Sequence, residues 1–202
     1  MAPRIPLVKP DDMSAAQKGV YDKIISGPRG TLVGPLRAAL HNPALADCWQ
    51  AFGQVLRYET SLPAQLNELA ILVAARHWNS ELEWTIHAAA ARKAGLDDAI
   101  INAIATATLP EFNSADERDI YEFSRELLEN GKVSDSAYAA VLDRWGTIGA
   151  VEITALVGYY SMVAMTLNAH QIPLPDHIPA ELNSDPPSRS PLPTSSRDTA
   201  VE

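Results

Sequence analysis

Three ionisable side chains within residues 67–96 are spaced so that they could share one site. Glu83 and His87 are four residues apart, so on a helix both project from one face, about one turn from each other. That face continues into alanines, and a carboxylate and an imidazole facing apolar packing are unfavourable unless they satisfy each other or act on a ligand. Glu68 precedes an apolar run on the preceding segment, and in an antiparallel helix pair it would approach His87.

This set of residues favours proton transfer. A carboxylate beside His87, such as Glu83, stabilises the imidazolium and holds the ring in one orientation, so the pair could act as an acid. Glu68 could relay the proton or, if Ile71 and Leu72 remove it from water, act as a base near neutral pH.

Structural roles would explain the same residues without any chemistry. Ser80 and Glu83 fit the S-x-x-E capping box. His87 could be a satisfied core histidine, and Glu68 could interact favourably with the helix dipole in a first turn. These three residues with His77 could also be considered as metal ligands, but an i, i+4 pair supplies only two ligands, and we predict no metal.

Two helices must position these side chains. Capping signals and apolar periodicity predict helices at residues 63–78 and 81–94, joined by about two residues and therefore packed as an antiparallel αα-hairpin. Residues 66–75 and 151–167 are apolar around nearly the whole circumference, which predicts burial on all sides, at the centre of a bundle or at a subunit interface. Strand signals are nearly absent, so we predict an all-α protein. Further helices are expected at 14–27, 35–41, 43–58, 98–108, 115–130, 135–145 and 150–168.

Composition excludes several functional classes. The chain of 202 residues carries 16 Lys and Arg against 25 Asp and Glu, a net charge of −9 that disfavours a nucleic-acid partner. Its longest apolar run, residues 69–75, is far shorter than the ~20 residues that cross a bilayer, and no signal peptide is recognisable. We therefore predict a soluble, cytoplasmic protein with no membrane partner. The single cysteine, Cys48, excludes an internal disulfide and a dithiol centre.

The composition changes near the C-terminus. Seven of the 15 prolines lie between Pro173 and Pro193, interleaved with serines. Such a segment buries too little apolar area to offset its ordering entropy. We predict one helical domain at residues 1–178 and a Pro/Ser-rich tail at 179–202, disordered or loosely draped over about 183–202.

The central stretch resembles the carboxymuconolactone decarboxylase family, which includes the alkylhydroperoxidase-D-like proteins. The matching pattern is E-L-A-I-L, a short turn, then E-W-x-x-H-x-x-x-A-x-x-x-G, which here places Glu83, Trp84, His87, Ala91 and Gly95. The segments RGTLVGP, HNPALA and GAVEITALVGYYSMVAMTLN also resemble family members, so the resemblance covers roughly residues 4–178. It implies an alkylhydroperoxidase-D-like helical bundle that assembles as a homotrimer or homohexamer.

The peroxidase branch of this family has cysteines at the positions of Ser80 and Glu83, a glutamate at Glu68 and a histidine at His87. Both cysteines are absent here. A thiolate is the nucleophile in that chemistry, and Cys48 has no partner to resolve a sulfenic acid. We therefore do not expect dithiol peroxidase activity.

The decarboxylase branch implies a cofactor-independent lyase that acts on a small carboxylated lactone from aromatic-compound breakdown. Its catalytic residues here would be Glu68, Glu83 and His87. Arg29, in a loop that contains glycines, would bind the substrate carboxylate through two hydrogen bonds, and Trp84 and Tyr160 would line the pocket. Two alternatives remain open: an isomerase, hydratase or hydrolase that uses the same residues, and a non-catalytic family member.

Overall fold

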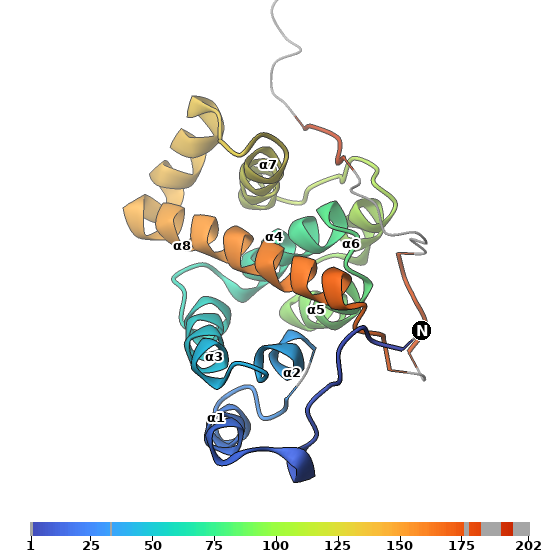
Figure 1. Ribbon diagram of the computed structural model, residues 1–202. Helices are drawn as coiled ribbons and strands as arrows, with labels where there is room; N and C mark the ends of the chain where they lie inside the picture. The colour runs from blue at the N-terminus through green and yellow to red at the C-terminus, as the bar shows by residue number, and fades with distance from the viewer. Residues whose placement is uncertain (1, 33, 176–177, 183–190, 196–202) are drawn as a thin grey trace, which may run out of the picture.

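The computed structural model describes residues 2–32, 34–175, 178–182 and 191–195 (Figure 1). Within these ranges all regular structure is helical and no strand occurs, which confirms the all-α prediction. A short 3-10 turn, Pro10–Asp12, precedes the α-helices. The α-helices are α1 Ala15–Ser26, α2 Pro35–Ala39, α3 Pro43–Tyr58, α4 Ala64–His77, α5 Glu81–Ala94, α6 Asp98–Ala105, α7 Ala115–Asn130 and α8 Asp135–His170.

Helices α4 and α5 pack against each other as the predicted hairpin. The turn between them depends on Asn79, which adopts a positive φ of 47°, a conformation that asparagine tolerates better than most residues. The N–H of Ser80 then donates to the carbonyl of Ala75 at 2.8 Å, which closes the turn. Helix α5 ends at Gly95, whose φ of 95° is the left-handed conformation expected of a helix-terminating glycine.

Helix α4 is the centre of the bundle. Its residues 66–75 are all buried, and the helix packs against α5, α7 and α8, so the burial predicted from its all-round apolarity is confirmed. The side-chain amide of Asn168 on α8 donates to the carbonyl of Trp78 at 2.8 Å. This bond ties the end of α8 to the turn that joins α4 and α5.

Helix α8 contains two helical segments that meet at Gly146, where φ is 64° and ψ is −171°. The two helices predicted for this region therefore meet at one kink. Within one chain the second segment is not buried on all sides, since Val151 is 63% exposed and Met165 is 46% exposed. Of the two predicted positions, the subunit interface is the one that would cover these side chains, and it stays a prediction. By length and composition α8 could cross a membrane, but half of its most apolar stretch is buried, and the core helix of a soluble protein passes the same test.

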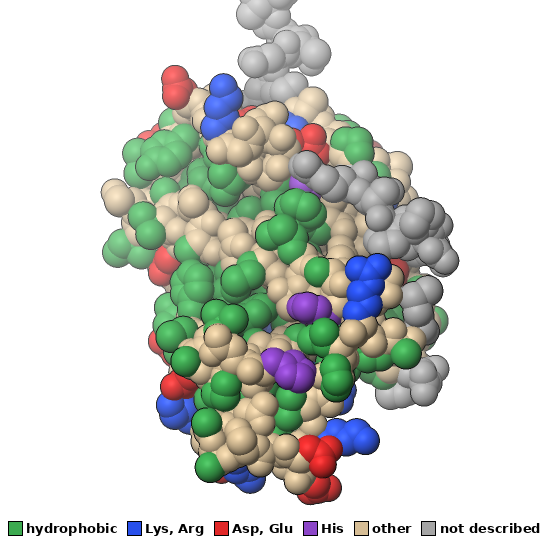
Figure 2. Space-filling view, viewed as in Figure 1, with side chains coloured by type: hydrophobic (Ala, Val, Ile, Leu, Met, Phe, Trp, Pro, Cys, Tyr) green, Lys and Arg blue, Asp and Glu red, His purple; other side chains and the backbone are tan. Residues whose placement is uncertain are grey.

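Apolar side chains gather on the outer surface of α3 and α8 (Figure 2). They include Leu45, Phe52 and Val55 on α3, and Ile148 and Val151 on α8. The homo-oligomer expected from the sequence would bury such a surface, and it stays a prediction.

Two described segments of the C-terminal tail contact the bundle. The Glu81 carboxylate accepts the N–H of Leu182 at 3.1 Å, and the Tyr121 hydroxyl donates to the carbonyl of Pro193 at 2.7 Å. Leu192 is buried. Residues 191–195 therefore pack on α7 rather than draping loosely, whereas the predicted disorder of residues 183–190 and 196–202 lies outside the described residues.

Candidate functional site

A small cavity lies among α5, α8, the loop after α1 and the helices α2 and α3. Its volume is about 40 Å³, close to the ~30 Å³ that one water molecule occupies in the liquid. Its polar lining residues are Arg29, Arg57, Glu83, His87, Tyr159 and Tyr160, and its apolar lining residues are Pro35, Leu36, Leu82, Ile86, Val163 and Leu167.

Glu68 and His87 form a buried pair in this site. The Oε2 atom of Glu68 lies 2.7 Å from Nδ1 of His87, which confirms that the hairpin brings the two residues together. With the Nδ1–H group donating a hydrogen bond to the Glu68 carboxylate, Nε2 is the ring nitrogen that can accept a proton from a ligand. Tyr160 packs edge-on against the imidazole, with ring centroids 4.8 Å apart.

The imidazole of His87 is held in its neutral form. Burial lowers its pKa, and the positive charges of Arg57 and Arg29 lower it further, while the hydrogen bond and charge of Glu68 act in the opposite direction. With its pKa below the ordinary value of 6.5, His87 is mostly unprotonated at neutral pH and is suited to act as a base.

Glu83 is the most unusual group in the site. It is 2% exposed, and neither of its carboxyl oxygens has a hydrogen-bond partner in the described part of the chain. Burial raises its pKa well above the ordinary value of 4.5, and the nearby Ser80 hydroxyl offsets this only in part, since it falls short of hydrogen-bond geometry. Burial therefore favours the protonated form of this carboxyl group beside the cavity, and that form suits an acid.

The expected pairing of Glu83 with His87 is wrong. His87 bonds to Glu68 across the hairpin, whereas Glu83 lies one turn before His87 on the same helix and also faces the cavity. The structure also does not support the two purely structural roles considered above, helix capping by Glu83 and a helix-dipole interaction of Glu68 in a first turn. The Ser80 side chain makes no capping hydrogen bond, and Glu68 lies beyond the first turn of α4.

The predicted ligand-contacting residues divide into two groups. Arg29 and Tyr160 line the cavity, as expected. Trp84 does not, so its predicted place in the pocket wall is wrong. One residue after Glu83, its side chain is turned by about 100° around the helix, and its indole N–H donates to Glu181 at 3.2 Å in the protein interior.

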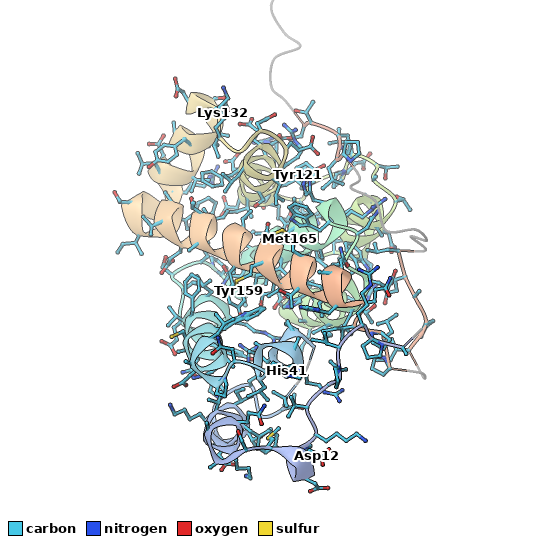
Figure 3. All side chains as sticks on the ribbon, in the orientation of Figure 1. Asp12, His41, Tyr121, Lys132, Tyr159 and Met165 are labelled. Atoms are coloured by element: carbon cyan, nitrogen blue, oxygen red, sulfur yellow. The ribbon has the colours of Figure 1, made fainter. Side chains whose placement is uncertain are left out.

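The sequence analysis did not predict two of the cavity residues, Arg57 and Tyr159. Arg57 lies in the last turn of α3, where a cation is explained by the helix dipole alone. Tyr159 lies where α8 crosses α3, and its ring packs edge-on against Phe52 at 5.4 Å (Figure 3). Burial raises the pKa of the Tyr159 hydroxyl, while the charge of Arg29 opposes this.

Gly53 makes this crossing possible. A methyl group at position 53 would overlap the Tyr159 hydroxyl and would stand 2.9 Å from Nη2 of Arg29. The absence of a side chain therefore lets α8 approach α3 and brings the tyrosine and the arginine to the cavity. The signal in the sequence is only one glycine inside a helical pattern.

We expect Gly53→Ala to lower the free energy of unfolding by about 1–3 kcal/mol, because the added methyl overpacks the crossing of α3 and α8. Urea denaturation measures this. Gly19→Ala is the matched control, since an added methyl at that helical position meets nothing within 4 Å and should leave stability unchanged or slightly raised. Equal stability of the two variants would contradict the close packing described here.

Among the described residues, no group of three or more His, Cys, Asp or Glu side chains has a geometry that could hold a metal ion.

The chain is similar to one protein family in sequence and to solved structures in fold. Residues 43–126 match the sequence profile of the Carboxymuconolactone decarboxylase family. A similar solved structure is the alkylhydroperoxidase AhpD core of an uncharacterized peroxidase-related protein from Ralstonia eutropha JMP134, with a TM-score of 0.70 and 12% identity over 86% of this chain and 93% of that one. A peroxidase-related protein from Silicibacter sp. TM1040 has a TM-score of 0.67 and 15% identity over 85% and 90%. No curated protein matches the chain.

Proposed function

The chain belongs to the carboxymuconolactone decarboxylase family and has the alkylhydroperoxidase-D-like fold, and from this premise we propose that it is a cofactor-independent lyase. Its substrate would be a small carboxylated lactone or a related ring-cleavage product. The observation that carries the proposal is one cavity lined by Glu83, a buried carboxyl group with no hydrogen-bond partner among the described residues, and by His87, which Glu68 orients. Burial raises the pKa of Glu83 and lowers that of His87, so an acid and a base coexist near neutral pH.

The proposed reaction exchanges a carbon–carbon bond for a carbon–hydrogen bond. When the carboxylate leaves as carbon dioxide, the bonding electron pair moves into the conjugated lactone. The protonated Glu83 then gives its proton to the carbon that received this charge. Glu83 is then ionised, and one proton taken up from the solvent by way of His87, which Glu68 orients, restores its protonated form, so one proton is consumed for each carbon dioxide released.

The size of the cavity limits how a ligand can bind. At about 40 Å³ it is well below the ~300 Å³ or more of typical small-molecule pockets. A lactone therefore enters only if apolar lining side chains such as Leu82 and Ile86 move aside. Those side chains would then also exclude water from the reacting group, which strengthens the electrostatic interactions there.

A second candidate function is isomerisation of a small molecule that can form an enolate. The same opposed pKa shifts favour it, because His87 can remove a proton from carbon while Glu83 donates one elsewhere. A dithiol peroxidase is not proposed. Ser80 and Glu83 occupy the positions where that branch has cysteines, and Cys48 lies exposed on α3.

Both functions are tested by incubating purified protein with a panel of carboxylated five-membered lactones. Carbon dioxide release and deuterium uptake from heavy water are measured for the wild type, His87→Ala and Glu83→Gln. Turnover with carbon dioxide release identifies a lyase, and deuterium uptake without it identifies an isomerase. Equal turnover by all three proteins would show that the assigned residues are not catalytic, and no turnover of any compound would contradict both functions on this substrate class.

A further inference from the structure

We propose that Arg57 and Arg29 together form a receptor for one carboxylate of the ligand, and that Arg57 fixes the position of that group beside His87. The inference rests on the proposed function in one respect, because it takes a small carboxylated molecule as the ligand. It adds a residue for which the sequence offered no signal beyond its place in the last turn of α3.

Both arginines line the cavity, and among the described residues no carboxylate lies within 4.0 Å of either guanidinium group, whereas one lies within that distance of Arg92, Arg118, Arg125 and Arg144. In the same part of the chain, Arg4, Arg37 and Arg76 likewise form no such ion pair with a described residue. Nη2 of Arg29 is also buried and makes no hydrogen bond of good geometry with the described residues, although the Tyr159 hydroxyl lies close to Arg29. A buried donor without an acceptor is unfavourable, and guanidinium cannot relieve this by losing its proton. A bound anion would supply the acceptor.

The charges around the cavity favour an anion of one unit charge. Two guanidinium groups face the cavity, and the carboxylate of Glu68 beside His87 offsets one of them. Burial raises the pKa of Glu83, which disfavours a second negative charge there. Both positive charges act on His87. They lower its pKa, although by less than burial does.

The shape of the site favours a carboxylate. A guanidinium group presents parallel N–H donors that match the two oxygens of a planar carboxylate. The cavity, at about 40 Å³, accommodates a group of only a few atoms. The Tyr159 hydroxyl lies beside Arg29 at the crossing with α3 and provides a further donor on the same wall.

Formate is a suitable probe, because it is a carboxylate without the rest of the ligand. We expect formate to raise the thermal unfolding temperature of the wild type in a saturable manner, relative to chloride at equal ionic strength. Arg57→Gln should weaken formate binding about 10- to 100-fold, which is typical of losing a charge-assisted hydrogen bond. Arg57→Lys should restore part of the affinity. Arg92→Gln is the matched control, since Arg92 pairs with Asp98 at the surface and should bind formate like the wild type.

A second readout follows the imidazole directly. The NMR titration of His87 should shift to higher pH when formate binds, because the anion offsets the arginine charges, and Arg57→Gln should shift it upward without formate. A purely structural role for Arg57 would not produce these shifts. Equal formate binding by Arg57→Gln and Arg92→Gln, or formate acting only as chloride does, would overturn the receptor. If Arg57→Gln does not fold, Arg57→Lys decides, and wild-type affinity in that variant counts against the bidentate contact.

The outcome is separable from that of the proposed function. Formate binding that depends on Arg57, with no turnover of any lactone, would support the receptor and contradict the lyase. Lactone turnover by Arg57→Gln with an unchanged KM would support the lyase and contradict the receptor.

Discussion

Replacing Glu83 by glutamine is expected to lower kcat by about 10²–10⁴-fold, the contribution typical of one general acid. Glutamine has nearly the same shape, but its amide is not an acid and therefore cannot protonate the substrate. The loss is measured as turnover of a lactone that the wild type converts in the panel described above. Glu111→Gln is the matched control, because this glutamate is exposed on the loop before α7 and should keep full activity.

The same variant should remove a pH dependence from the stability of the protein. Because burial raises the pKa of Glu83 in the folded state, its contribution to stability is fully present below its ordinary value of 4.5 and is lost as pH rises through the folded-state value. Relative to the wild type, Glu83→Gln should therefore gain stability as pH rises through this window, while Glu111→Gln should not. Urea denaturation at several pH values provides the comparison. Parallel curves for wild type and Glu83→Gln would contradict a buried, protonated carboxyl group.

Replacing His87 by alanine is expected to reduce kcat/KM by about 10²–10⁴-fold, because the base and proton carrier of the site is lost. In the wild type the acidic limb of the pH–rate profile should lie below pH 6.5, since burial lowers the pKa of His87 from that value. Activity should rise as pH increases through this limb. A profile with no acidic limb would argue against a role for the neutral imidazole.

Glu68→Gln provides a finer test of the same group. The Glu68 carboxylate raises the pKa of His87 through its hydrogen bond and its charge, so removing that charge should move the acidic limb to still lower pH. A reduced rate with an unmoved limb would mean that Glu68 only packs against the ring. The two outcomes separate an electrostatic role from a structural one.

Local sequence determined the helices and the relation between neighbouring side chains along each of them. Ser14 and Gln17 form the predicted capping box at the start of α1, because a cap depends on residues three positions apart. The i, i+4 spacing likewise placed Glu83 and His87 on one face of α5, and the short turn at Asn79 required α5 to fold back on α4. Each of these features follows from backbone geometry within a few residues.

Only the tertiary structure decided which carboxylate pairs with His87 and which residues complete the cavity. Glu68 is 19 residues from His87, and the register of the hairpin brings the two into contact. Arg57 and Tyr159 reach the cavity because α3 and α8 cross at Gly53, a contact between segments about a hundred residues apart. The opposed pKa shifts of Glu83 and His87 arise mainly from burial, and burial depends on the packing of the whole bundle rather than on any local pattern.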